Sequence, residues 1–263
     1  HEAHTIQALR NGNHVLCEKP MAISSSGANR MLLEAEKSGK KLFVVKQNRF
    51  NPPVALLKSL VDEGKIGRIH AFQMNCFWHR PAAYFSDGWR GTLQWDGGTL
   101  FTQFSHFIDL MYWLLGGVEE VTGYRENVLH KGLIEFEDHG AALLTMSSGA
   151  KGVLQYSLNA NTRNMEGSFT VFGDKGTVKV GGEYLNRLDY FSVEGLPVPP
   201  MEPGKPANTY GFYQGSMSNH HKVYEHLFHD LDNQGQALVE AAEAMQTVTI
   251  IEKIYNGSPL VQG

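Results

Sequence analysis

The chain has 263 residues, of which 42% are apolar and 19% are charged, and its formal net charge is −4. This composition excludes an intrinsically disordered protein, and the length suits one large domain or two modest ones. The chain is slightly acidic and has no block of Lys and Arg to neutralise phosphates, so we expect no nucleic-acid partner.

Membrane insertion and a disulfide scaffold are also disfavoured. No apolar run approaches the ~20 residues that a spanning helix needs, and no signal-peptide pattern opens the chain. Only Cys17 and Cys76 are present, too few for a disulfide framework. We therefore expect a cytoplasmic protein with no membrane partner.

The first 49 residues alternate between helices and short strands. Apolar spacing and turn residues predict a helix ending at Gly12, a strand at 15–17, a helix at about 25–39 and a buried strand at 42–46. This rhythm is typical of the end of a doubly wound, parallel α/β sheet. Two strands are too few for such a sheet, so we expect further strands to precede it.

From residue 50 the pattern changes to an α+β unit. A helix at about 53–64, a long strand at 68–79 and a buried helix at about 98–115 come first. Turn-rich segments then separate strands near 118–127, 132–138, 140–148, 151–160, 167–172, 176–181 and 187–192. A Pro/Gly-rich loop at 196–208 leads to closing helices at about 218–234 and 236–256. We predict that residues 50–263 form a large, mostly antiparallel open sheet with helices, and that the closing helices pack back on residues 1–49.

The first candidate for chemistry is Cys17-Glu18-Lys19-Pro20, at the carboxyl end of a predicted strand. Ligands bind outside such strand ends in open α/β sheets. A desolvated Lys19 has a lowered pKa and suits acid–base chemistry. The alternative is a solvated loop with an ordinary ion pair.

The second candidate is the predicted helix around GGTLFTQFSHFIDLMYWLLGG (97–117). Apolar residues surround it on nearly all sides, so the helix is buried. Its polar side chains then need partners or a cavity; they are Thr102, Gln103, Ser105, His106 and Asp109. His106 suits proton transfer near neutral pH. The alternative is a core histidine bonded to Asp109 or to a backbone carbonyl.

The third candidate is WHRPAAYFSDGWRGTLQWDGG (78–98), which is rich in aromatic residues and Arg. Such a segment suits a hydroxyl-rich or phosphorylated ligand, and the alternative is a surface loop packed on its own domain.

Known catalytic and metal motifs are mostly missing. Neither HEAH at 1–4 nor the region around His226 has zinc-peptidase spacing, although His221, Glu225 and His229 can share a helix face as a less favoured zinc site. No G-x-S-x-G, G-x-G-x-x-G or P-loop motif occurs. We expect no metal.

The motifs in order resemble one family. H-x-x-H, H-V-L-C-E-K-P, strand-Q-N-R-F-N-P, W-R-G and G-G-x-L-x-T-Q-x-x-H-x-I-D are similar to the glucose–fructose oxidoreductase/inositol dehydrogenase (Gfo/Idh/MocA) family, and the resemblance covers essentially all of the chain. It implies that residues 1–49 are the C-terminal remnant of a Rossmann domain and that the glycine-rich loop lies upstream.

The resemblance also implies roles for individual residues. Lys19 and His106 match the catalytic acid/base pair, whereas Thr102 stands where many members have Asp. Implied cofactor contacts are His1, Glu18, Lys19, Pro20, Gln47, Trp89 and Arg90. Implied substrate contacts are Arg80, Tyr84, Thr102, Gln103, Asn161 and Arg163.

The implied function is hydride transfer between a sugar ring carbon and NAD or NADP. The missing Asp, the W-R-G segment and the tail SMSNHHKVYEHL favour the sugar-nucleotide branch, with oxidation at C3. The family likeness also implies a homodimer or homotetramer formed through the sheet. The alternative is a non-catalytic carbohydrate-binding or dimerisation module.

Overall fold

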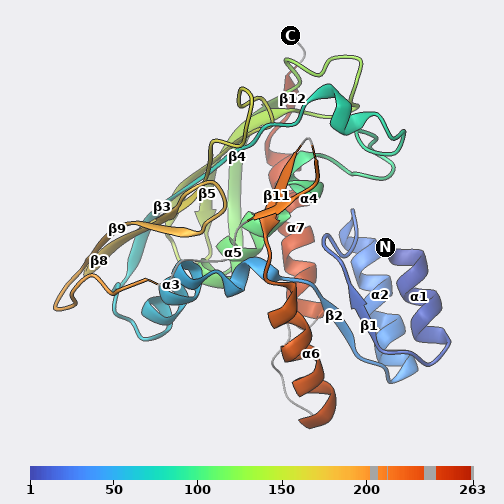
Figure 1. Cartoon of the computed structure of the whole chain (residues 1–263), viewed down its shortest axis with the longest axis horizontal. Coiled ribbons are helices and arrows are strands. Elements are labelled where there is room, and N and C mark those ends of the chain that lie inside the picture. The colour runs from blue at the N-terminus through green and yellow to red at the C-terminus, as the bar shows by residue number, and fades with distance from the viewer. Residues whose placement is uncertain (202–206, 212, 234–240, 262–263) are drawn as a thin grey trace.

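The computed structural model describes residues 1–201, 207–211, 213–233 and 241–261. Figure 1 shows a small α/β part, formed by the first two helices and strands, beside a large curved sheet that carries helices on one face. Long helix α7 (Ala241–Gly257) lies between these two parts and contacts α2, β2 and β4.

The small part has the predicted order of elements. Helices α1 (Glu2–Arg10) and α2 (Ser25–Ser38) pack on each other beside strands β1 (Val15–Cys17) and β2 (Leu42–Val44), which pair in parallel. The Ser24 hydroxyl accepts a hydrogen bond from the Gly27 amide, and Gly39 closes α2 in the left-handed conformation. These caps satisfy backbone groups that the helix leaves unpaired, so the predicted boundaries of α2 hold within one residue, whereas β2 ends two residues before the predicted strand.

The large part is an eight-stranded mixed sheet. Its strands are β3 (Ile69–Phe77), β4 (Val118–Glu126), β5 (His139–Met146), β6 (Lys151–Ser157), β7 (Glu166–Gly173), β8 (Gly176–Gly181), β9 (Arg187–Val193) and β12 (Leu260–Val261). The order is β12-β4-β5-β6-β3-β7-β8-β9. The pairs β12–β4 and β3–β6 are parallel and the others antiparallel, which confirms the predicted mostly antiparallel sheet.

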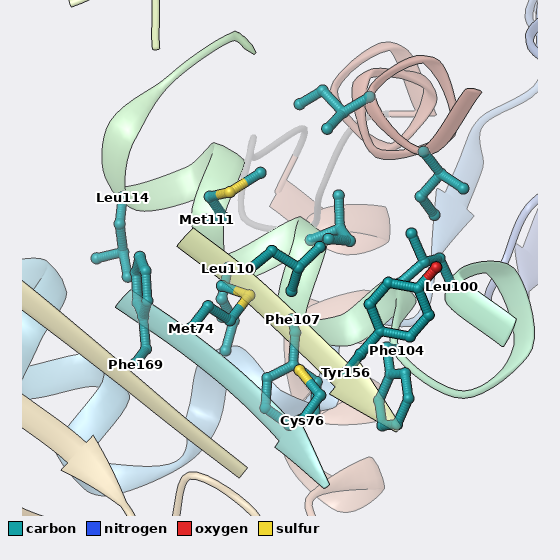
Figure 2. Packing of buried hydrophobic residues seen from close by; sticks show 14 of the residues in the cluster. Met74, Cys76, Leu100, Phe104, Phe107, Leu110, Met111, Leu114, Tyr156 and Phe169 are labelled. Carbon is teal, nitrogen blue, oxygen red and sulfur yellow. The ribbon is translucent and has the colours of Figure 1, made fainter. Parts of the chain in front are cut away.

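The core fills the helical face of this sheet. Figure 2 shows Phe104 and Phe107 packed against Met74, Cys76 and Tyr156 of β3 and β6. Phe107 belongs to α5 (Ser105–Leu115), which is apolar on almost every side and is therefore buried on almost every side. Helix α3 (Pro52–Asp62) begins at the proline pair that follows the short helix η1 (Gln47–Phe50).

Two predicted elements differ in the structure. The helix expected over 98–115 is divided into α4 (Thr99–Thr102) and α5, and the break exposes polar groups of Thr102 and Gln103 to a cavity. The strand expected over 132–138 is irregular, since the buried side chains of Ile134 and Phe136 pack in a loop whose Glu135 amide bonds the Gly91 carbonyl. The alternation of apolar residues in this segment therefore arises from side chains buried in a loop, and the segment forms no β-strand pairing.

The closing segments contact the small part as expected. The hairpin β10 (Ala207–Thr209) and β11 (Gln214–Met217) precedes α6 (His220–Asn233), and the predicted helix start at 236–240 lies outside the described residues. The Lys41 ammonium bonds the Asp230 carbonyl, and Glu252 of α7 accepts the Ser25 amide hydrogen. Within the described ranges, no helix has the length and apolarity to cross a membrane.

Candidate active site

An inner cavity of about 240 Å³ lies where the small part meets the sheet. Predicted site residues from four separate segments line it together: Glu18, Lys19, Gln47, Arg80, Tyr84, Thr102, Gln103 and His106. Lys19 follows β1, Gln47 opens η1, Arg80 follows β3, and His106 lies in the first turn of α5. Residues distant in sequence therefore converge on one polar space.

Lys19 is held at the mouth of this cavity. Its ammonium donates a 2.9 Å hydrogen bond to the carbonyl oxygen of Thr102, at the break between α4 and α5. Loss of solvent lowers the pKa of Lys19 to about 8, with Arg80 and Lys46 adding to the effect and Glu18 opposing it. An amine with this pKa exchanges a proton readily near neutral pH.

His106 is 4% exposed and its ring is neutral in this setting. Desolvation lowers its pKa well below the usual value, and the positive charges of Lys19, Lys46 and His220 act in the same direction. The Gln47 amide nitrogen lies 3.2 Å from Nε2 of His106. Because an amide nitrogen only donates, Nε2 accepts this bond and the ring hydrogen resides on Nδ1.

A buried ionic cluster supports this helix from behind. The Arg49 guanidinium donates two hydrogen bonds to the Asp109 carboxylate at 2.9 and 2.7 Å, and the Lys46 ammonium lies 3.0 Å from the same group. Burial would raise the pKa of Asp109, but Lys46 and Arg49 outweigh it and the pKa is lowered. Asp109 is thus bound to these cations and is not the partner of His106.

One part of the inner cavity wall is a hydrogen-bonded network of Arg80, Gln103 and the aromatic Tyr84. Gln103 accepts a 2.7 Å hydrogen bond from Nε of Arg80 and donates a 2.9 Å bond to the Tyr84 hydroxyl. Because both Gln103 groups are satisfied, the buried amide is fixed in orientation. Tyr84, Arg80 and Gln103 thereby form one hydrogen-bonded part of the cavity wall, which Lys19 and His106 also line.

A wider outer cavity of about 630 Å³ adjoins the inner one. It shares Lys19, Tyr84 and Thr102 with the inner cavity. The predicted cofactor contacts that line it are His1, Lys19, Pro20, Trp89 and Arg90. The His1 ring bonds the Pro20 carbonyl at 2.7 Å, which joins α1 to the loop after β1.

Two predicted substrate residues lie elsewhere. Arg163 is exposed and lines a separate cavity of about 310 Å³ that shares Tyr213 with the inner one. Asn161 is exposed, and none of the described cavities includes it in its lining. The geometry therefore separates both from Lys19 and His106.

Sequence reasoning missed several lining residues. Those of the inner cavity are Trp78, Asn208, Tyr210, Tyr213, Gly215 and His220, and those of the outer cavity include Trp95 and Asp96. Asp96 precedes the glycine pair that opens α4, and burial raises its pKa to about 6. Trp78, Trp95 and Asp96 lie in the aromatic segment 78–98 that the sequence analysis singled out, although it assigned these three residues no role. Across the ranges that the structure describes, no group of three or more His, Cys, Asp or Glu is placed to hold a metal ion.

Comparison with known families matches both parts of the chain. Residues 1–46 match the model described as an oxidoreductase family with an NAD-binding Rossmann fold, and residues 54–179 match the GFO/IDH/MocA C-terminal domain. Among curated proteins, 1-carboxy-3-chloro-3,4-dihydroxycyclohexa-1,5-diene dehydrogenase of Comamonas testosteroni is 34% identical over 164 residues. The alignment covers 57% of this chain and 40% of that protein.

Solved structures of two similar proteins agree with the family matches of both parts of the chain. The WlbA dehydrogenase of Bordetella pertussis, in complex with NADH and UDP-GlcNAcA, is 34% identical with a TM-score of 0.85, and the match covers 98% of this chain and 73% of that one. The WlbA dehydrogenase of Chromobacterium violaceum, with the same ligands, is 31% identical with a TM-score of 0.85 and coverage of 98% and 72%. Since a Rossmann-type segment, the large sheet and a relative at this identity all coincide, the chain belongs to the Gfo/Idh/MocA family of oxidoreductases.

Proposed function

We propose that the whole protein is an NAD(P)-dependent dehydrogenase that oxidises a ring hydroxyl of a sugar or sugar nucleotide. The observation that carries the proposal is the convergence of Lys19 and His106 on one cavity that opens to a second, larger one. A non-catalytic binding module has no need of an amine with a pKa of about 8 beside a buried neutral imidazole.

The outer cavity suits the nicotinamide end of a dinucleotide. Trp89 and Trp95 present exposed rings to it, and planar groups stack favourably on such rings. Nε of Arg90 is buried and has no partner among the described residues, so an acceptor on a bound group would satisfy it. His1, Pro20, Trp89 and Arg90 are the residues that would hold this end, and the chain itself carries no glycine-rich pyrophosphate loop.

Lys19 is the proposed base. NAD or NADP, when bound, supplies the hydride acceptor. The hydroxyl proton passes to Nζ of Lys19, which is near its pKa at neutral pH and faces the cavity. Because Nε2 of His106 accepts a hydrogen bond from Gln47, we do not assign it the hydroxyl proton. The proposed role of His106 is to orient the hydroxyl and to stabilise the charge that develops on the hydroxyl oxygen.

The finer proposal concerns the substrate. We infer a sugar nucleotide oxidised at C3 of the ring. Thr102 stands where many family members have Asp, a replacement that the resemblance links to the sugar-nucleotide branch, and Thr102 and the following Gln103 both line the inner cavity. The likeness to the WlbA dehydrogenases solved with UDP-GlcNAcA supports this class.

A homo-oligomer formed through the outer face of the sheet is also proposed. Leu143 and Val153 are opposite each other on β5 and β6, with side chains 62% and 37% exposed. An apolar strip on a broad sheet face suits an isologous contact with a second copy.

The test uses the complete protein. Reduction of NAD and NADP would be followed at 340 nm with a panel of UDP-sugars and free sugars, for the wild type, Lys19→Ala and the exposed control Lys37→Ala. We expect turnover by the wild type and the control and a loss of at least ~10²-fold in Lys19→Ala. Near-normal turnover of Lys19→Ala would refute the proposed role.

A further inference from the structure

The acceptor that binds Lys19 belongs to a helix of one turn. The carbonyl oxygen of Thr102 accepts the 2.9 Å hydrogen bond from the Lys19 ammonium, and Thr102 is the last residue of α4. So short a helix is not stable by itself, because its few internal hydrogen bonds do not offset the entropy lost in ordering the chain. The place of the Thr102 carbonyl, and with it that of the amine, therefore depends on the residues that bind α4 from outside.

The hydroxyl of Tyr255, on α7, binds the first turn of α4. It accepts a 2.9 Å hydrogen bond from the Leu100 amide and donates a 2.7 Å hydrogen bond to Oε1 of Glu137. The first amides of a helix have no acceptor within it, so this hydroxyl satisfies a group that α4 itself leaves unpaired. Because a hydroxyl both donates and accepts, one chain of hydrogen bonds runs from α4 through Tyr255 to the carboxylate.

Glu137 binds the same turn a second time, through its main chain. The Thr99 hydroxyl donates a hydrogen bond to the Glu137 carbonyl oxygen. The Glu137 side chain is fully buried, and burial raises the pKa of its carboxyl, while the Tyr255 hydrogen bond and the charge of Arg125 oppose the rise. The main chain and the side chain of Glu137 thus both connect to the first turn of α4, one directly and the other through Tyr255.

Gly98 leaves the space that the Tyr255 hydroxyl occupies. Its φ is +131°, which favours glycine, and a Cβ atom at Gly98 would lie 2.3 Å from Oη of Tyr255. The ring itself makes an edge-to-face contact with Phe101, with 5.8 Å between the ring centroids, and Cζ of Arg125 lies 4.7 Å from the Tyr255 centroid. Packing of both the ring and the hydroxyl therefore places Tyr255 at the start of α4.

The properties of the Lys19 amine depend on its desolvated place. Loss of solvent is the main cause of its lowered pKa; the charges of Arg80 and Lys46 lower the pKa further, and those of Glu18 and Asp96 raise it. If the carbonyl that binds the ammonium moved, the amine would gain water. Its pKa would then rise toward the ordinary value of about 10.4.

Neither Glu137 nor Tyr255 is among the described residues that line the two cavities, whereas Lys19 and Thr102 line both. Their influence on the amine therefore passes through α4. We propose that Tyr255 and Glu137 are positioning residues for Lys19, which fix the first turn of α4 and thereby the Thr102 carbonyl that binds the ammonium. This inference rests on the proposed function, in which Lys19 is the base.

Two matched tyrosine variants of the complete protein test the proposal. Tyr255→Phe removes the hydroxyl and keeps the ring. Tyr156→Phe is the control, because the Tyr156 hydroxyl lies 3.4 Å from the same Oε1 of Glu137 but bonds no group of α4 among the described residues. Acetylation of Lys19 by acetic anhydride would be measured by mass spectrometry between pH 6 and 11, with the exposed Lys37 as internal reference.

Only the neutral amine is acetylated, so the midpoint of the pH profile reports the pKa of Lys19. We expect a midpoint near 8 in the wild type and in Tyr156→Phe, and one at least about one pH unit higher in Tyr255→Phe. At pH 7 such a rise leaves about tenfold less neutral amine, so kcat/KM for sugar oxidation should fall at least about tenfold.

Two results overturn the proposal: an unchanged midpoint in Tyr255→Phe, or an equal rise of the midpoint in Tyr156→Phe. Should Tyr255→Phe fail to fold, Thr99→Val decides, because it removes the hydroxyl that bonds the Glu137 carbonyl. A higher midpoint in Thr99→Val supports the positioning role, and an unchanged one refutes it.

The labelling separates this inference from the proposed dehydrogenase function, because acetylation needs no hydride transfer. Normal turnover of Lys19→Ala together with a midpoint that depends on Tyr255 refutes Lys19 as the base and leaves the positioning of its amine intact. Loss of turnover in Lys19→Ala with an unchanged midpoint in Tyr255→Phe refutes the positioning alone.

Discussion

The ammonium of Lys19 and the carbonyl oxygen of Thr102 are joined by a 2.9 Å hydrogen bond across 83 positions of sequence. The bond holds the amine of the loop after β1 against the break between α4 and α5. It thereby brings Lys19 into the cavity that His106 lines. The break in the helix is what frees the Thr102 carbonyl to act as acceptor.

The lowered pKa of Lys19 predicts a pH-dependent rate. In the direction of sugar oxidation the neutral amine is the active form, so kcat/KM should rise with pH and level off above a pKa of about 8. Lys19→Arg keeps the charge but stays protonated, so its rate should fall at least ~10²-fold. Initial rates between pH 6 and 10 check this, with the exposed Lys37→Arg as control; a flat wild-type profile would exclude Lys19 as the base.

Gln47 is predicted to set the protonation of His106. Gln47→Leu removes the donor to Nε2 and should lower kcat about tenfold with a smaller effect on KM, because the imidazole loses its fixed orientation. Gln47→Glu places an anion beside the ring and should raise the pKa of His106. NMR titration of the His106 ring measures this; an unchanged titration in Gln47→Glu contradicts the contact.

Asp109 is predicted to be essential for stability. Asp109→Asn leaves the buried Lys46 without its anion and leaves Arg49 with only the partly exposed Glu243, 3.0 Å away, so the free energy of unfolding should fall by roughly 3–5 kcal/mol. Urea unfolding measures the change. The exposed Asp62→Asn is the matched control and should stay within about 0.5 kcal/mol of the wild type. A similarly small effect in Asp109→Asn would show that the cluster contributes little.

His130 is predicted to make stability fall at alkaline pH. Its Nδ1 lies 3.0 Å from Asp138 and its Nε2 lies 2.9 Å from the Arg80 carbonyl, so two acceptors require a doubly protonated ring. The hydrogen bond with Asp138 raises the pKa of His130, and burial opposes the rise. Because the folded pKa exceeds the unfolded one, this stabilisation is complete below about pH 6.5 and is lost as pH rises through the folded pKa.

The matching experiment compares the wild type with His130→Gln. The free energy of unfolding should differ more between the two proteins at pH 6 than at pH 8.5. The exposed His4→Gln serves as control. A difference that does not change with pH would show that His130 is neutral in the fold.

Charge on the outer sheet face is predicted to separate the copies of an oligomer. Leu143→Lys with Val153→Lys places two cations in the apolar strip, so light scattering should give a smaller mass than for the wild type. Leu129→Lys changes an equally exposed residue off the sheet and should leave the mass unchanged. A wild-type mass in the double variant would exclude this face as the contact.

The sequence by itself determined the features that depend on neighbours in the chain. Ser24 and Gly39 fixed the ends of α2, the apolar runs fixed β1 and β2, and the ordered motifs around Lys19 and His106 identified the family, because capping, strand periodicity and short motifs act over a few residues.

Only the tertiary structure decided the parallel pairing of β3 with β6, the break before α5, the assignment of Asp109 to Lys46 and Arg49, and the enclosure of Arg80 by three aromatic rings. These relationships join segments that are distant in sequence. Their partners are selected by burial and charge balance in the packed core, which no local pattern specifies.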